Sequence, residues 1–233
     1  MSDGLQASIE KMKREGVPDA SIATFEHYYQ QLAAGESGMI PEDSIDPVKD
    51  LPSAEELPPG NPPLDQAVII KLNGGLGTSM GMDRAKSLLQ VKDGLAFLDI
   101  IARQVLALRE ASGARLPLVL MNSFYTRDDS LALLERYPDL AADVPFDFVQ
   151  HKEPKLLVDG LQPADWPPDR SLEWCPPGHG DIYPALLTSG MLENLLERGY
   201  RYAFMSNSDN LGACSSRAPS RGSRPSGCPT WPR

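Results

Sequence analysis

Residues 72–81, Leu-Asn-Gly-Gly-Leu-Gly-Thr-Ser-Met-Gly, combine clustered glycines with hydroxyl side chains, and Lys86 follows shortly after them. Because glycine has no Cβ atom, such a loop lets backbone N–H groups approach an anion closely. Lys86 adds a mobile positive charge. The apolar, β-branched run at 67–72 predicts a buried strand that leads into the loop, and a helical pattern follows the loop. This combination favours contact with a nucleotide phosphate.

The spacing of the glycines separates this loop from two common nucleotide-binding motifs. It is not a P-loop, because no Gly-Lys-Ser/Thr follows at the required offset. It also differs from the usual dinucleotide fingerprint, since Gly75, Gly77 and Gly81 give G-x-G-x-x-x-G. A nicotinamide oxidoreductase with Asp99 on the ribose is therefore a weak alternative. A tight strand–helix turn with a surface lysine is the other.

Three later segments give the loop a more specific interpretation. The loop, closed by Lys86-Ser87, resembles the signature loop of the UTP–glucose-1-phosphate uridylyltransferases, which are also called UDP-glucose pyrophosphorylases. The later segments fall in the same order as in that family: Phe148-Val149-Gln150 with Pro154-Lys155, the run from Trp174 to Ala185, and the run from Ser206 to Gly212. The resemblance extends to about Ala213 and then stops.

The resemblance implies an α/β fold with a Rossmann-like sheet of the nucleotide-diphospho-sugar transferase kind. It also implies transfer of UMP from UTP to glucose 1-phosphate, which gives UDP-glucose and pyrophosphate. The nucleophile is already an anion, so cations and backbone donors do the main work. By resemblance Lys86 is the catalytic cation. Asp209 is then the ligand of Mg²⁺, an ion that prefers few carboxylates plus water and phosphate oxygens. The ordinary alternatives are a helix lysine and a turn-capping aspartate.

Recognition of uridine requires both donors and acceptors for the uracil edge. Gln150 matches the side chain that reads uracil in the family, and an amide can donate and accept at once. The other substrate-binding positions implied by the resemblance are Leu72, Asn73, Gly74 and Gly75, through their backbone, and Gly178, His179 and Asn207. The family's glucose-binding residues, its second phosphate lysine and any second metal carboxylate would lie beyond Ala213. An inactive UTP-binding fragment, or a pyrophosphorylase for another sugar 1-phosphate, therefore stays an alternative.

Alternating strands and helices must position these residues. Apolar patterns predict strands at 67–72, 116–121, 145–150 and 202–205, and helices at 95–109, 128–137 and 184–198. Two further helices are expected between about residues 5 and 34. Such alternation predicts a parallel-rich α/β sheet. Ligands of such sheets bind at the carboxyl ends of the strands, and every motif above lies at such an end.

The predicted organisation has three parts. A helical and extended segment occupies 1–63, the nucleotide-binding part of a catalytic α/β domain occupies 64–213, and a tail occupies 214–233. The tail is rich in Ser, Arg, Pro and Gly and has almost nothing apolar to bury, so we expect it to be disordered. The abrupt change of composition at residue 214 resembles an out-of-frame translation, so we expect a truncated chain. Such a chain should have an exposed sheet edge and low solubility. We also expect no measurable UDP-glucose synthesis.

Composition limits the class of protein. The chain has 233 residues and a formal net charge of −10, which argues against a nucleic-acid partner. No apolar run is long enough for a membrane span, and the N-terminus has no signal-peptide pattern, so the expected location is the cytoplasm. Cys175 precedes the tail without a partner cysteine, which fits a reducing compartment. The oligomeric state is not readable from the sequence.

Overall fold

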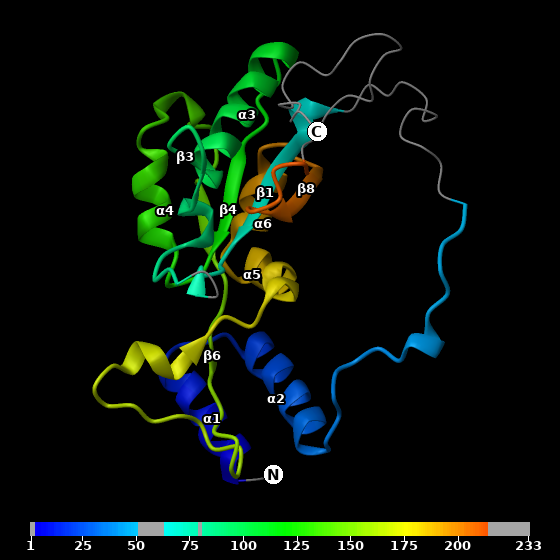
Figure 1. The fold of residues 1–233 in the computed structure, drawn as a ribbon, viewed down its shortest axis with the longest axis vertical. Coiled ribbons are helices and arrows are strands. Elements are labelled where there is room, and N and C mark those ends of the chain that lie inside the picture. The colour runs from blue at the N-terminus through cyan, green and yellow to red at the C-terminus, as the bar shows by residue number, and fades with distance from the viewer. Residues whose placement is uncertain (1–2, 51–62, 79–80, 214–233) are drawn as a thin grey trace. The chain divides into compact units, whose positions relative to one another are not determined.

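The computed structural model describes residues 3–50, 63–78 and 81–213, and these form two compact units (Figure 1). The N-terminal unit comprises the described residues of 1–53 and 151–177, and the sheet unit comprises those of 54–150 and 178–233. Residues 151–177 therefore group with the N-terminal helices. The boundaries predicted from the sequence lie at residues 63 and 213 and place residues 151–177 with the sheet. The tail at 214–233 lies outside the described residues.

The sheet unit is built on four parallel strands in the order β5-β4-β1-β8. Their bounds are β1 (Ala67–Asn73), β4 (Leu118–Asn122), β5 (Asp147–Val149) and β8 (Tyr202–Asn207). All four strands predicted from the apolar runs are present, and the parallel arrangement is confirmed. β5 and β8 are the two edge strands of the described sheet, and the Tyr202 and Met205 side chains of β8 are exposed.

Helices cover both faces of this sheet because successive strand residues point to opposite sides. Ile69 and Leu120 pack against α3 (Phe97–Ser112) and α4 (Arg127–Leu134). Val68, Ile70 and Met121 pack on the other face against α5 (Ile182–Thr188) and α6 (Met191–Glu197). The buried strands thus read as nearly continuous apolar runs, as is typical of parallel sheets.

Three predicted helices differ from the observed ones. The helix predicted at 128–137 is α4, which begins at Arg127 and ends at Leu134. The helix predicted at 95–109 begins at Phe97, because Leu95–Ala96 forms β3 and pairs with β2 (Gln90–Lys92). It continues to Ser112 and ends at Gly113, whose φ of 69° is left-handed. The single helix predicted at 184–198 is wrong. Two short helices meet at Gly190, where a φ of 74° interrupts the helical hydrogen bonds.

Short 3₁₀ turns join the main elements. In the sheet unit these are η2 (Leu64–Gln66), η4 (Lys86–Leu88), η5 (Pro138–Leu140) and η7 (His179–Asp181). η2 leads directly into β1, η4 carries Lys86, and η7 precedes α5. Two of the predicted functional residues, Lys86 and His179, therefore begin such turns.

The N-terminal unit contains the two predicted helices, α1 (Asp3–Arg14) and α2 (Asp19–Ala33), followed by η1 (Glu42–Ser44). Its second segment supplies η6 (Arg170–Glu173) and an antiparallel pair, β6 (Glu153–Pro154) with β7 (Trp174–Cys175). Lys11 of α1 joins the segments by an ion pair with Glu173. Lys152 pairs with Glu15 at 2.6 Å. These contacts explain why residues 151–177 belong to this unit.

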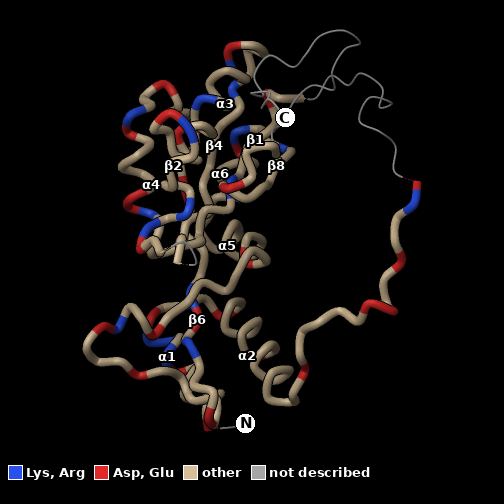
Figure 2. Tube along the Cα trace, viewed as in Figure 1, with Lys and Arg blue, Asp and Glu red and all other residues tan. Residues whose placement is uncertain are grey.

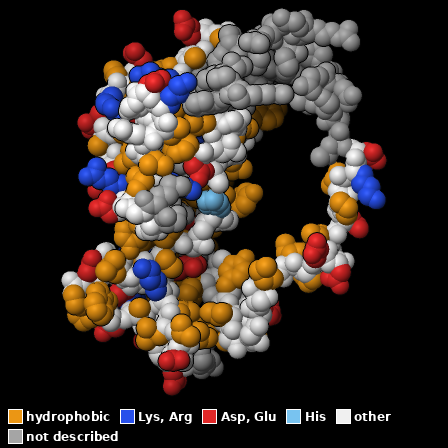
Figure 3. All heavy atoms as spheres, viewed as in Figure 1, with side chains coloured by type: hydrophobic (Ala, Val, Ile, Leu, Met, Phe, Trp, Pro, Cys, Tyr) orange, Lys and Arg blue, Asp and Glu red, His pale blue; other side chains and the backbone are white. Residues whose placement is uncertain are grey.

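The surface charge is mixed. Figure 2 shows acidic and basic residues along both α3 and α4, and the face drawn in Figure 3 intersperses the two signs among apolar side chains. The visible described atoms thus lack the single basic stripe that is typical of nucleic-acid-binding proteins. Within the described ranges, none of the helices combines the length and the hydropathy that crossing a membrane requires.

Candidate active site

The predicted motifs follow strands whose carboxyl ends lie in register. Asn73 at the end of β1 pairs with Asn122 of β4, and Leu72 pairs with Asn207 of β8. Gln150 directly follows β5, and its backbone N–H donates to the Asn122 carbonyl at 2.8 Å. The glycine-rich loop, Gln150 and Asn207 thus leave one edge of the sheet, as the alternation of strands and helices predicted.

The glycine-rich loop is closed by its own backbone. Leu76 and Ala85 form an antiparallel bridge, and the Lys86 N–H donates to the Gly75 carbonyl at 3.0 Å. Gly77 is required by packing, because a Cβ atom there would lie 2.8 Å from the sulfur of Met82. Residues 79–80 lie outside the described part of the loop. The closure fixes the backbone of Lys86 next to the first glycines.

Lys86 and Asp209, which the sequence predicts as catalytic cation and metal ligand, form an ion pair. The Lys86 Nζ lies 2.7 Å from Asp209 Oδ2. Their side chains are 35% and 30% exposed, so solvent and ligands can reach both. Lys86 is the first residue of η4. Asp209 follows β8, the strand that lies next to β1 in the sheet. The fold therefore places a mobile cation beside a carboxylate at the end of the sheet, an arrangement that can hold a phosphate and a divalent cation together.

Gln150 and Gly74 form a second contact at this edge. Gln150 is 5% exposed, and a Cβ atom on Gly74 would lie only 2.0 Å from its Nε2. Only glycine at position 74 admits this side chain. Among the described residues, the Gln150 Oε1 has no hydrogen-bond partner. A buried acceptor without a partner is energetically unfavourable, so the site suits a ligand that brings an N–H donor.

Asn73 and Leu72, which are predicted to bind the substrate through their backbone, also make hydrogen bonds within the protein. The Asn73 side chain is buried and donates to Asn122 Oδ1 at 2.7 Å and to Ser130 Oγ at 2.8 Å. The Leu72 carbonyl accepts from the backbone N–H and the hydroxyl of Ser208, at 3.2 and 3.0 Å. Asn122, Ser130 and Ser208 were missed by the sequence reasoning. The polar end of the β4 run was the signal for Asn122, and Ser208 lay within the run from Ser206 to Gly212. Nothing in the sequence singled out Ser130.

Gly178, His179 and Asn207 are exposed. Gly178 has φ 114° and ψ −173°, a conformation open almost only to glycine, and η7 (His179–Asp181) follows it. Among the described residues, no hydrogen bond or ion pair joins the His179 or Asn207 side chain to Lys86 or Gln150. Their predicted contacts with substrate stay predictions.

Asp99, which would bind the ribose if the chain were a nicotinamide oxidoreductase, is not available for this role. Asp99 is buried, and its Oδ2 accepts from the Ala96 backbone N–H at 2.9 Å. Its Oδ1 accepts from the Tyr137 hydroxyl at 2.8 Å and from Arg136. Asp99 therefore caps α3 and ties it to the residues after α4, and both carboxylate oxygens are occupied.

Comparisons with known proteins agree on one family. The family model of the UTP–glucose-1-phosphate uridylyltransferases matches residues 22–218. The UTP–glucose-1-phosphate uridylyltransferase of Solanum tuberosum is 42% identical over 176 residues, which are 75% of this chain and 36% of the relative. The barley enzyme of the same name is 35% identical over 221 residues, 91% of this chain and 46% of the relative.

A solved structure is similar over nearly the whole chain. It is a mutant UDP-glucose pyrophosphorylase from Leishmania major in complex with UDP-glucose, with a TM-score of 0.85 and 43% identity. The match covers 94% of this chain and 46% of that structure. The chain thus spans between about a third and a half of the length of the relatives it matches.

Proposed function

The chain belongs to the UTP–glucose-1-phosphate uridylyltransferase family, and we propose that it binds UTP and carries the catalytic lysine for transfer of UMP to glucose 1-phosphate. The products are UDP-glucose and pyrophosphate. One observation carries the proposal above the others: Lys86 and Asp209 form a half-exposed ion pair at the carboxyl edge of the sheet, although they lie far apart in sequence.

The chemistry follows from the charges of the reactants. A phosphate oxygen of glucose 1-phosphate forms a bond to the α-phosphorus of UTP, and the bond from that phosphorus to the bridging oxygen of pyrophosphate breaks. The attacking oxygen is already anionic, so no general base is needed. Negative charge spreads over the α-phosphoryl oxygens in the transition state. In our proposal the Lys86 ammonium donates to one of these oxygens and stabilises that charge.

Magnesium fits the residues present, provided that the substrate supplies other oxygens. Among the described residues no group of three or more His, Cys, Asp or Glu side chains could hold a metal ion. Mg²⁺ is usually bound by one or two carboxylates together with water and phosphate oxygens, and Asp209 can supply one carboxylate. When bound, the ion would neutralise phosphate charge. Lys86 would then leave its pairing with Asp209 and turn toward the phosphate.

The uracil would be recognised beside Gly74. Uracil presents an N–H flanked by two carbonyl groups, and the Gln150 amide offers an unpartnered acceptor together with a donor. The backbone of Leu72, Asn73, Gly74 and Gly75 would line the same face of the base. Gly178, His179 and Asn207 would contact the nucleotide from the exposed loops. We also propose a cytoplasmic location, since Cys175 is a free thiol, as is usual in a reducing compartment.

Two measurements on the 233-residue chain test the proposal. Calorimetric titration with UTP, CTP and ATP in Mg²⁺ should show a preference for UTP. Gln150→Leu should abolish that preference because it removes both hydrogen bonds to the base. Any pyrophosphate release should require both UTP and glucose 1-phosphate, although the sequence predicts no measurable turnover by this chain alone. Equal affinity for the three nucleotides would rule out the assigned base site.

The second candidate function is UTP binding without turnover. The specific observation in its favour is that the chain spans only 36% to 46% of the relatives. Under this alternative UTP binds with the stated selectivity, but no pyrophosphate is released with any sugar 1-phosphate. Release with N-acetylglucosamine 1-phosphate but not with glucose 1-phosphate would instead identify a pyrophosphorylase for another sugar.

A further inference from the structure

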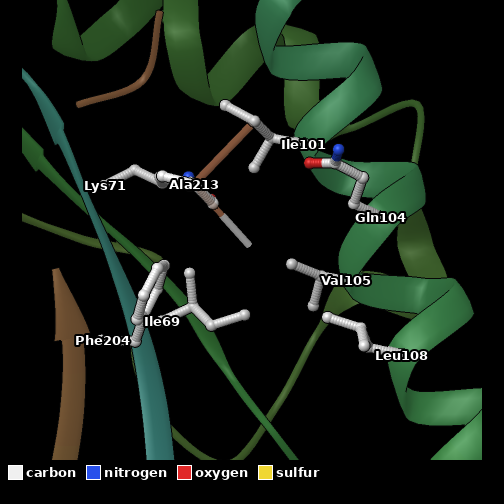
Figure 4. A pocket seen from close by; sticks show the side chains of 8 residues that line it. All are labelled: Ile69, Lys71, Ile101, Gln104, Val105, Leu108, Phe204 and Ala213. Carbon is white, nitrogen blue, oxygen red and sulfur yellow. The ribbon is translucent and has the colours of Figure 1, made fainter. Parts of the chain in front are cut away.

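A lysine lies buried in the middle of the central strand. Lys71 of β1 is 2% exposed and stands opposite Ser206 of β8. Its Nζ donates to the Ser206 hydroxyl at 2.7 Å and to the Ala213 carbonyl at 3.1 Å. Figure 4 shows Lys71 beside Ala213 in a setting of apolar side chains from β1, β8 and α3. The proposed chemistry at Lys86 and Asp209 does not use this group.

The described surroundings of Lys71 do not suit a substrate. The adjoining cavity is lined mainly by apolar residues, including Ile69, Ile101 and Phe204. Its volume is about 10 Å³, roughly enough for one water molecule. No ion pair joins Lys71 to a carboxylate within the described ranges, and burial lowers the pKa of its ammonium to about 8. Burial of a lysine ammonium without a carboxylate is energetically unfavourable, so we looked for a role of Lys71 in its hydrogen bonds.

The contacts of Lys71 bracket the segment that carries Asp209. Ser206 precedes Asp209 by three residues and Ala213 follows it by four. Two further hydrogen bonds hold the residues between Ser206 and Ala213. Ser208 donates to the Leu72 carbonyl, and the Leu211 carbonyl accepts from Gln104 Nε2 at 3.3 Å. Among the described residues, the Lys71 side chain therefore ties both ends of the 206–213 segment to β1.

We propose that Lys71 is a positioning residue that holds the 206–213 segment so that Asp209 meets Lys86 and the metal-bound phosphate. This inference rests on the proposed function of Asp209. A lysine suits the task because its ammonium carries three donors on one atom at the end of a long chain, so one side chain can serve two acceptors. A methionine of similar length would fill the space but leave the Ala213 carbonyl without this donor.

The test separates loop order from nucleotide binding. Lys71→Met is compared with Lys92→Met, a matched change at an exposed lysine of the same unit. Hydrogen exchange of the amides of residues 208–213 reports the order of the segment. UTP affinity with and without Mg²⁺ reports the contribution of Asp209. We expect faster exchange in Lys71→Met and a metal-dependent gain in UTP affinity reduced by about fivefold or more, with metal-free affinity unchanged. Lys92→Met should match the parent in both.

Asp209→Asn provides the test of mechanism. If Lys71 acts through Asp209, Lys71→Met should have no further effect on the metal-dependent gain once Asp209 is replaced. A further loss in the double variant would overturn the proposal. Faster exchange with an undiminished metal-dependent gain would also overturn it, because Lys71 would then be merely structural.

Two other outcomes are decided by companion measurements. If Lys71→Met does not fold, as judged by circular dichroism, Ser206→Ala removes one of the two contacts while keeping the lysine, and the same two changes are expected in smaller size. An unchanged Ser206→Ala variant would contradict the inference. If the parent chain shows no metal-dependent UTP binding, the proposed function fails and this inference fails with it. Normal binding in the parent and in Lys71→Met would refute this inference alone.

Discussion

The N-terminal unit and the sheet unit each contain a lysine–carboxylate pair, and the two pairs differ in their access to solvent. In the N-terminal unit the side chains of Lys11 and Glu173 are 13% and 2% exposed. In the sheet unit those of Lys86 and Asp209 are 35% and 30% exposed. Lys11 also donates to the Ala164 carbonyl and lies 5.4 Å from the centre of the Trp174 ring.

Saturation of the carboxylate separates the pairs further. Glu173 accepts from Lys11, from the Trp166 backbone N–H at 2.7 Å and from Arg170 at 2.8 Å. Among the described residues, Asp209 pairs with the side chain of Lys86 alone. A saturated, enclosed pair joins two segments of chain, whereas a half-open pair keeps bonding capacity for a ligand. We therefore assign the pair of Lys86 and Asp209 to chemistry, and the pair of Lys11 and Glu173 to structure.

The largest effect expected from this contrast is on turnover. Lys86→Met should lower the rate of UDP-glucose formation by at least about 100-fold, because the transition state loses a positioned cation. Its free energy of unfolding should stay within about 1 kcal/mol of the parent, as is usual for an exposed pair. Steady-state pyrophosphate release and urea unfolding measure the two quantities. In the UTP-binding alternative, the loss appears in the affinity for UTP with Mg²⁺.

Lys11→Met serves as the matched control for that experiment. It breaks an enclosed pair, so it should destabilise the chain more than Lys86→Met does, while selectivity for UTP persists. If Lys86→Met unfolded the chain and Lys11→Met abolished nucleotide binding, the roles assigned to the two pairs would be reversed.

The next effect concerns two adjacent glycines at the site. A Cβ atom on Gly74 would collide with Gln150, whereas one on Gly75 meets nothing within 4 Å. Gly74→Ala should therefore displace the Gln150 amide and weaken UTP binding by about tenfold, the loss of roughly one hydrogen bond. Gly75→Ala should fold as the parent does. Any loss of its UTP affinity would report that the nucleotide itself approaches Gly75. Parent-like binding by Gly74→Ala would remove Gln150 from base recognition.

The strands and the site edge could be predicted from the sequence because local patterns encode them. The runs that form β1 and β4 are apolar, and each ends in polar or glycine residues where ligands of a parallel sheet bind. Lys86 and Asp209 were predicted one by one from motifs. Their ion pair was not, since it depends on β8 lying next to β1.

Other features depend on contacts distant in sequence. Residues 151–177 join the N-terminal unit through pairs such as Lys11–Glu173, which no periodicity reveals. The break at Gly190 was missed because one glycine inside an apolar pattern is compatible with a continuous helix. Lys71 gave no signal as a buried group, since a lysine in a strand pattern usually reaches solvent.

Unlike Lys11 and Lys86, Lys71 has no carboxylate partner among the described residues. Its burial makes the free energy of unfolding depend on pH. Its pKa is about 8 in the folded chain, against an ordinary value of 10.5. Between these values the unfolded chain binds more protons, so the free energy of unfolding rises with pH. Lys71 should contribute a rise of about 1 to 2 kcal/mol from pH 8 to pH 10, and Lys71→Met should remove that contribution. Burial raises the pKa of the Cys175 thiol, which acts in the opposite direction in both proteins.

The upper limit of that pH range is set by another group. Burial, together with the hydrogen bond to Asp143, raises the pKa of Tyr200 to about 12. Above pH 10 the unfolded tyrosine loses its proton while the folded one keeps it, so stability falls. Urea unfolding of the parent and Lys71→Met at pH 8, 9 and 10 therefore isolates the lysine. Parallel slopes in the two proteins would show that Lys71 does not cause the rise.

The smallest expected effect is the acid response of the enclosed pair. The hydrogen bond from Lys11, followed by that from the Trp166 backbone, lowers the pKa of Glu173 to about 2, against an ordinary value of 4.5. This contribution to stability is fully present above pH 4.5 and is lost as the pH falls toward 2, because the unfolded chain takes up the proton first. Lys11→Met removes the largest cause of the shift, so its free energy of unfolding should fall less steeply over that range. The matched variant is Lys86→Met, which leaves Glu173 untouched and should keep the slope of the parent. Urea unfolding at pH 5, 4 and 3 gives the three slopes. If Lys11→Met kept the parental slope, Glu173 would owe its low pKa to Trp166 and Arg170, and the enclosed pair would contribute less to the N-terminal unit than its burial indicates.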